Sequence, residues 1–343
     1  MNILDAKHIF SYRKYWAQRF GMVKEFPMTV AEMDAVGWDS CDIILVTGDA
    51  YVDHPSFGMA VIGRVLEAQG FRVGIISQPD WKSAEDFKRL GKPNLFFGVT
   101  GGNMDSMVNR YTSDKKIRSN DAYTADGEGG KRPDRAVNVY SHRCREAYKE
   151  VPIIIGGIEA SLRRMAHYDY WSDKVRKSVL LDSKADLLVY GNAERQIVEI
   201  AHRLAAGELV NDLKGIRGTV HFVKQVPADW TVKDSSDIDT PGVVIKPKNP
   251  YQMEEETVCA SKTEEAQKSS TPERVRISND QRTKTIIRLP DYDTVKDDPI
   301  QYAHASRVMH GETNPGNARP LLQKHMQRLL WLNPPPIPLT TSE

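Results

Sequence analysis

The most constraining feature of this chain is a series of short apolar runs that alternate with segments of helical spacing. The runs occupy residues 42–48, 71–76, 94–99, 151–155 and 186–190, and most of them end at one or two glycines. Runs of this length are typical of buried strands in parallel sheets. Helical spacing is found at residues 56–70, 137–149 and 193–206. The alternation predicts an α/β fold, a doubly wound parallel sheet of the flavodoxin-like or Rossmann-like kind.

The chain has 343 residues, enough for two domains or for one domain with large insertions. We expect an N-terminal arm over residues 1–40, the α/β domain over residues 41–220 and a polar, loop-rich extension over residues 221–343. In the extension the sequence predicts short strands at residues 275–277 and 286–289, a helix at residues 321–330 and an extended proline strap at residues 333–338.

Charge and cysteine usage exclude several classes of protein. The chain has 47 basic and 46 acidic residues, a net charge of +1, so no global field draws it to nucleic acid or to an anionic membrane. No apolar stretch has membrane-spanning length, and the N-terminus does not resemble a secretory signal, so we expect a cytoplasmic protein. Cys41, Cys144 and Cys259 are too far apart for a disulfide framework or a locally encoded metal loop, and no metal site is predicted.

In parallel α/β sheets ligands bind at the carboxyl ends of the strands, so the strand-end loops are the candidate site. The loop after the first strand contains Asp49, Tyr51, Asp53, His54 and Ser56. It leads into a helix, whose N-terminus suits a phosphate or a carboxylate, and His54 is a candidate metal ligand or general base. The alternative is a turn in which Ser56 or Asp53 caps the helix.

Three further loops repeat this pattern. Gly101 and Gly102 follow the third run and permit close approach of a ligand to the backbone. Asn192 and Glu194 follow the fifth run, where they either contact a ligand or cap a helix. The loop after the fourth run holds Gly156, Gly157, Glu159, Ser161, Arg163 and Arg164.

The two arginines of this last loop have two possible roles. Either of them is suited to hold an anion through a bidentate contact, or to form a structural ion pair with Asp169 or Asp173. Farther along, residues 302–319 mix histidines, arginines and a glutamate, and we expect a lid or an interface there. No catalytic residue is predicted.

Several long runs of unusual composition carry a resemblance to a known family: residues 48–58, 156–164, 167–171, 190–195, 302–319 and 331–339. Over essentially its whole length the chain resembles the N-terminal domain of YgiQ-type radical SAM proteins. The resemblance implies an α/β part similar to cobalamin-binding domains, followed by a radical SAM barrel. It also implies that the barrel holds a [4Fe-4S] cluster on a Cys-x3-Cys-x2-Cys loop and cleaves S-adenosylmethionine reductively, in a reaction that is undefined.

The chain departs from this family in two ways. Its three cysteines cannot form the cluster loop, so we expect a truncated member that lacks its partner, the radical SAM barrel, and is inactive alone. The cobalamin motif Asp-x-His-x-x-Gly is not kept, because Asp53 and His54 are adjacent and Gly58 follows four residues after His54. This spacing argues against corrinoid ligation by His54.

Three functional hypotheses therefore remain open. The first is the N-terminal region of a radical SAM enzyme. The second is a module that binds a small molecule, either a corrinoid, a nucleotide or another anion. The third is a non-functional truncation product.

Overall fold

A computed structural model of the chain describes residues 6–243 and 284–343. Cys259 and the strand predicted at residues 275–277 lie outside the described residues. No helix in the described part is both long enough and apolar enough to span a bilayer.

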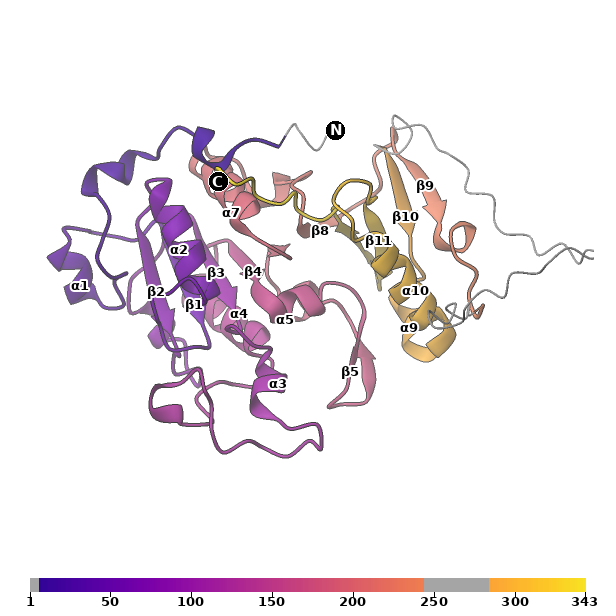
Figure 1. Cartoon of the computed structure of the whole chain (residues 1–343), viewed down its shortest axis with the longest axis horizontal. Helices are drawn as coiled ribbons and strands as arrows, with labels where there is room; N and C mark the ends of the chain where they lie inside the picture. Colours follow the sequence, from indigo (N-terminus) through magenta and orange to yellow (C-terminus); the bar gives the residue numbers. More distant parts are fainter. Residues whose placement is uncertain (1–5, 244–283) are drawn as a thin grey trace, which may run out of the picture.

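Five parallel strands form the first half of a large sheet, in the order β2-β1-β3-β4-β7 (Figure 1). They are β1 (Ile43–Thr47), β2 (Val73–Ser77), β3 (Phe96–Thr100), β4 (Ile153–Gly156) and β7 (Leu187–Val189). Each coincides with one of the predicted apolar runs, and every residue of β1 is buried, as expected for a strand covered on both faces. The chain leaves β1 toward β2 and then crosses to β3 on the other side. The strand order therefore reverses between β1 and β3, and open α/β sheets bind ligands at the point where the strand order reverses.

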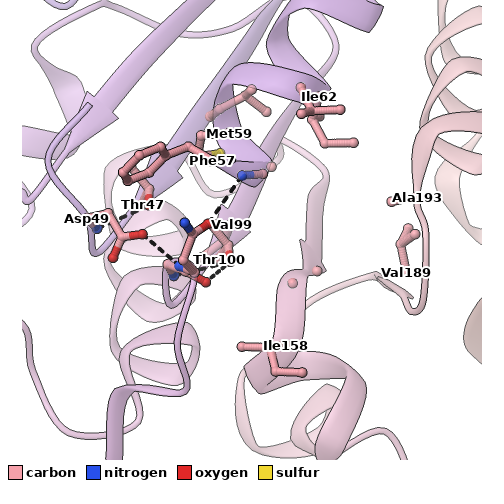
Figure 2. Close-up of a pocket in the computed structure, with 18 of the residues that line it drawn as sticks. Thr47, Asp49, Phe57, Met59, Ile62, Val99, Thr100, Ile158, Val189 and Ala193 are labelled. Carbon is pink, nitrogen blue, oxygen red and sulfur yellow. Dashed lines mark hydrogen bonds between the residues drawn. The ribbon is translucent and has the colours of Figure 1, made fainter. Parts of the chain in front are cut away.

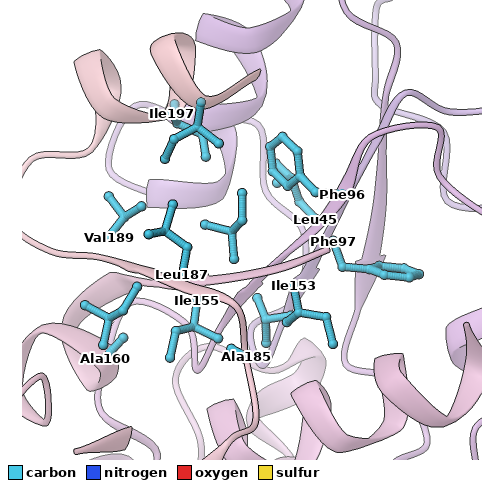
Figure 3. Packing of buried hydrophobic residues seen from close by; sticks show 14 of the residues in the cluster. Leu45, Phe96, Phe97, Ile153, Ile155, Ala160, Ala185, Leu187, Val189 and Ile197 are labelled. Atoms are coloured by element: carbon cyan, nitrogen blue, oxygen red, sulfur yellow. The ribbon is translucent and has the colours of Figure 1, made fainter. Parts of the chain in front are cut away.

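Helices cover both faces of these strands. On one face α2 (Gly58–Ala68) packs against α7 (Glu194–Ala205), and on the other α4 (Ala136–Ala147) packs on β3 and β4 next to α5 (Gly157–Leu162). Figure 3 shows Ile197 of α7 and Ala160 of α5 on opposite sides of the strands. The predicted helices at residues 56–70, 137–149 and 193–206 are thus confirmed.

The extension does not stand apart, because its strands continue the same sheet. After β7 the order is β8-β12-β11-β10-β9, in which β8 is antiparallel to β7, β12 is antiparallel to β8 and β11, and β9, β10 and β11 are mutually parallel. The bounds are β8 (Thr219–Val223), β9 (Thr231–Asp234), β10 (Thr285–Arg288), β11 (Leu321–His325) and β12 (Arg328–Leu332). The strand predicted at residues 286–289 is therefore confirmed, and the sheet as a whole is mixed.

The helix predicted at residues 321–330 is wrong, because this segment forms the β11–β12 hairpin. The hairpin turns at Met326, which has a positive φ of 55°. The leucine-rich pattern of residues 321–330 is compatible with a helix as well as with strands. The segment forms strands because β12 pairs with β8. Among its described residues the extension contains the α-helices α9 (Tyr292–Asp297) and α10 (Pro299–Gly311), although we expected it to be rich in loops.

The short elements flank this framework. In the described residues they are η2 (Ile9–Ser11), η3 (Trp16–Phe20), α1 (Val30–Ala35), η4 (Asp86–Lys88), α3 (Ser106–Arg110), η5 (Ala125–Gly127), the β5 (His167–Asp169) and β6 (Lys174–Arg176) hairpin, α6 (Val179–Asp182), η6 (Val210–Asp212) and η7 (Ser235–Asp237). The N-terminal arm is held to α2 by Arg64, which donates to the backbone carbonyls of Val23 and Lys24 at 2.8 Å each.

The proline strap lies along the amino end of α7. Arg195 donates from Nε to the Ile337 carbonyl at 3.1 Å and from Nη2 to the Pro338 carbonyl at 3.1 Å. The Gly218 N–H donates to the Pro334 carbonyl at 2.7 Å. The predicted extended strap is thus confirmed, and backbone hydrogen bonds fasten it to the sheet domain.

Candidate functional site

A pocket of about 310 Å³ opens at the carboxyl ends of β1, β3, β4 and β7, between the amino ends of α2 and α7 (Figure 2). Its wall is mainly apolar. Phe57, Met59 and Ile62 come from the side of α2, and Ile158, Val189 and Ala193 from the side of α5, β7 and the loop before α7. The volume is in the range of small-molecule sites.

The polar side chains of the lining are few: Thr47, Asp49, Tyr51, Thr100, Asn103, Asn192 and Glu194. Asp49 and Glu194 are acidic, and among residues 6–243 and 284–343 no lysine, arginine or histidine lines the pocket. The described lining therefore offers hydrogen-bonding groups and negative charge beside an apolar surface, and no cationic side chain that would pair with an anion.

Asp49 is fixed by a buried arginine. Arg132 Nη2 lies 2.6 Å from Asp49 Oδ1, and Arg132 Nη1 donates to the Gly101 carbonyl at 2.8 Å. Both side chains are at most 5% exposed. Burial raises the pKa of the Asp49 carboxyl above its usual value, and the positive charge of Arg132 opposes that shift. Because its two oxygens are engaged, Asp49 positions the loop and is not free to bind a ligand.

Asn103 connects this ion pair to the start of α2. The second oxygen of Asp49 accepts the Asn103 backbone N–H at 2.6 Å. The Asn103 side chain accepts the Gly58 N–H at 3.2 Å and donates to the Ser56 carbonyl at 3.0 Å. The Asn103 side chain therefore provides the hydrogen-bond acceptor for the first N–H of α2. The prediction that Ser56 or Asp53 caps this helix is wrong.

Two glycines of the site are required by its packing. Gly157 has a φ of +80°, and a Cβ there would lie 2.2 Å from Thr100 Oγ1. Gly102 has a φ of +113°, and a Cβ there would lie 2.1 Å from Asp49 Oδ1. A side chain at either position would strain the backbone and displace a pocket residue.

The pocket brings together part of the predicted site: Asp49, Tyr51, Gly102, Gly156, Gly157, Asn192 and Glu194. Asp53, His54 and Ser56 do not line it. Asp53 pairs with Arg64, and His54 is exposed, with Nδ1 accepting the Ser56 N–H at 3.1 Å. This placement gives no support to His54 as an axial ligand or base of the pocket.

Glu159 has a structural role. It is 1% exposed, and its carboxylate accepts the N–H of Ser106 at 3.0 Å and that of Val137 at 3.1 Å, at the starts of α3 and α4. Burial raises the pKa of Glu159. A Cβ on Gly101 would lie 2.4 Å from this carboxylate, which explains the glycine there.

Arg163 and Arg164 do not line the pocket, so their predicted role as anion ligands has no geometric support there. Arg163 pairs with buried Asp105, not with Asp169 or Asp173 as predicted. Arg164 lies over the Tyr190 ring, 5.0 Å from its centroid, and donates to the Ser161 carbonyl. The Ser161 hydroxyl donates to the Gly157 carbonyl at 2.8 Å.

Sequence reasoning missed Arg132, which lies in a polar loop with no distinguishing pattern. Its partners are 83 and 31 positions away in the chain, so no local signal could have found it. Residues 302–319 were expected to form a lid or an interface, but none of them lines the pocket. In that segment His304 is buried between Asp239 and Ser235.

The described cysteines do not form a metal site. Cys41 and Cys144 are fully buried, and burial raises the pKa of the Cys41 thiol to about 12 and that of Cys144 further. Thiolates are the ligating form, so this environment disfavours metal binding. In the described ranges no three histidine, cysteine or acidic side chains converge as a metal site would require. These residues do not fit a [4Fe-4S] cluster.

Comparison with known proteins finds a family model and several relatives that match nearly the whole chain. Residues 26–343 match the family model described as radical SAM N-terminal. A UPF0313 protein of Pseudomonas aeruginosa is 60% identical over 344 residues, which cover 98% of this chain and 46% of that protein. A UPF0313 protein of Chromobacterium violaceum is 60% identical over 353 residues, which cover 100% of this chain and 47% of that protein. The chain thus spans about half the length of the curated relatives it matches.

One solved structure is similar to part of the chain. It is the radical S-adenosylmethionine methyltransferase TsrM from Kitasatospora setae, with cobalamin and a [4Fe-4S] cluster bound. The TM-score is 0.35 at 20% identity, covering 54% of this chain and 28% of TsrM. This likeness is too low to carry an argument about the site.

Proposed function

The chain belongs to the radical SAM N-terminal family, and from that premise we propose that it is the ligand-binding N-terminal module of a radical SAM enzyme. In this proposal the [4Fe-4S] cluster and the cleavage of S-adenosylmethionine are supplied by sequence outside this chain. Two observations support the division. The described cysteines do not fit a cluster, and the curated relatives are about twice as long as the segment they share with this chain.

The observation that carries the binding role is the pocket at the point where the strand order changes direction. An apolar wall from α2 and α7 faces a few fixed hydrogen-bonding groups, which is the usual composition of a small-molecule site. A flat ring system fits this arrangement, because apolar walls bury ring faces and peripheral polar groups orient the ring. A corrinoid held by a histidine fits less well, because none of the residues that the structure describes places a histidine in the lining.

Binding is tested with three uncharged ring compounds, namely adenosine, guanosine and riboflavin, by isothermal titration and by the shift in melting temperature. We expect at least one of them to bind with a stoichiometry of one per chain. The variant Ala193→Phe places a ring in the pocket and should abolish binding. The control Ala206→Phe lies at the exposed carboxyl end of α7 and should bind normally. The binding role fails if neither these three compounds nor their 5′-phosphates bind, or if Ala193→Phe binds as well as the control does.

The proposal that the [4Fe-4S] cluster is held outside this chain is tested separately. The chain is incubated anaerobically with ferrous iron and sulfide and then desalted. We expect its visible spectrum to show no charge-transfer bands of an iron–sulfur cluster. A stable cluster with cysteine ligation would contradict the proposal that the cluster lies elsewhere.

A further inference from the structure

Glu194 is a free charge at the pocket. It is the first residue of α7 and lines the pocket together with Asn192 and Ala193. Within residues 6–243 and 284–343, no hydrogen bond or ion pair engages its carboxylate, whereas Asp49 is held by Arg132 and Asn103. Glu194 is therefore the charged group of the lining that is available to a ligand.

The neighbouring cations do not neutralise Glu194. Arg195 follows it directly, but its guanidinium binds the carbonyls of Ile337 and Pro338 and the carboxylate of Glu343. Arg164 lies over the Tyr190 ring.

From these observations we infer that the pocket selects an uncharged nucleoside-type ligand, and that Glu194 determines this selectivity by accepting hydroxyl donors and repelling phosphate. The inference rests on the proposed binding role of the same pocket. The apolar wall receives the ring, and the carboxylate of Glu194 accepts hydrogen bonds from ligand hydroxyls. A hydroxyl donor to a carboxylate makes a short, strong hydrogen bond. A phosphate at this position meets a like charge, and no basic side chain of the described lining offsets it.

This inference narrows the hypothesis of an anion-binding module. The nucleotide-binding sites of open α/β folds place phosphates at a helix amino end with free N–H groups. Here the carboxylate of Glu194 stands at the first residue of α7 and lines the pocket, so a phosphate at this helix end would meet a like charge. The amino end of α7 therefore suits the uncharged part of a nucleotide-like ligand better than its phosphate.

The test uses matched pairs of probes: adenosine and adenosine 5′-monophosphate, guanosine and guanosine 5′-monophosphate, riboflavin and flavin mononucleotide. For the pair whose uncharged member binds the wild-type chain, we expect the phosphorylated member to bind more weakly, by a factor of about ten or more. Glu194→Gln keeps an oxygen acceptor but removes the charge, so it should tighten binding of the phosphorylated member about tenfold and change binding of the uncharged member much less.

The matched control is Glu199→Gln. Glu199 lies on the same helix, pairs with Arg203 and does not line the pocket, so neither probe should respond to its substitution. The inference is overturned if the wild-type chain binds a phosphorylated probe as tightly as its uncharged partner, or if Glu194→Gln leaves their ratio unchanged. Failure of the binding role itself is a separate outcome, in which neither member of any pair binds.

Discussion

Removal of the Arg132 side-chain charge should be among the most damaging single changes in this protein. Arg132→Met keeps an apolar stem of similar length but removes the partner of Asp49 and the donor to the Gly101 carbonyl. Asp49 and Asp121 are 3% and 4% exposed, so two carboxylates would remain buried without their cation. Breaking a buried ion pair from one side costs about 3–5 kcal/mol. We expect a loss of that size in the free energy of unfolding, measured by urea denaturation at pH 7.

The pH dependence of this loss identifies its cause. Burial already raises the pKa of Asp49 in the folded wild-type protein, and loss of Arg132 should raise it further. A carboxyl whose pKa is higher in the folded than in the unfolded state binds more protons when folded. The free energy of unfolding therefore decreases as pH rises through the interval between the two pKa values. The deficit of Arg132→Met relative to wild type should therefore shrink as pH is lowered from 7 toward 5.

The control is Arg328→Met, in which an exposed arginine on β12 is replaced. It should change the free energy of unfolding by about 0.5 kcal/mol or less at either pH. A deficit below about 1 kcal/mol for Arg132→Met, or a deficit that does not change with pH, would refute the assignment of a buried ion pair to this site.

Three other predictions follow from single contacts. Gly157→Ala should lower the free energy of unfolding by about 1–3 kcal/mol in thermal denaturation, because a Cβ at a φ of +80° would lie 2.2 Å from Thr100 Oγ1; a neutral effect would contradict this. Arg195→Ala should increase hydrogen exchange at residues 339–343, because Arg195 binds the Glu343 carboxylate and the Pro338 carbonyl just before this segment, whereas Arg203→Ala should not. Burial lowers the pKa of His221 to about 4, so its contribution to stability is complete above about pH 6.5 and is lost as pH falls toward 4. A proton NMR titration of His221 with a midpoint above pH 6 would show that reasoning to be wrong.

The fold of the first half was predictable because its strands are buried on both faces. Residues of β1 are all apolar up to Thr47, so the run is visible without knowledge of its neighbours. The β11–β12 hairpin was not predictable in this way. Leu321, Leu322, Leu330 and Leu332 are buried by pairing with distant strands, and their spacing alone does not separate a helix from two strands.

The location of the site was also predictable, but the roles of its residues were not. The carboxyl ends of parallel strands meet at one edge of the sheet, so the strand-end loops pointed to the pocket. Which side chains face the pocket depends on partners elsewhere in the chain. Glu159 turns toward the starts of α3 and α4, and Arg163 turns toward Asp105, a residue of another strand-end loop. The sequence shows that these side chains lie near the carboxyl ends of the strands. It does not show the direction in which they point.

The arrangement of charge explains how the strand-end loops are fixed without basic side chains in the described lining of the pocket. Arg132 pairs with Asp49 and Arg163 pairs with Asp105, so both guanidinium groups are used within the protein. The loop that leads to Glu194 is supported differently. Its Gly191 lies against Pro336 of the strap, where a Cβ would be 3.2 Å from Pro336 Cγ. Arg195 binds the strap and pairs with Glu343, so this support leaves the neighbouring carboxylate of Glu194 unpaired.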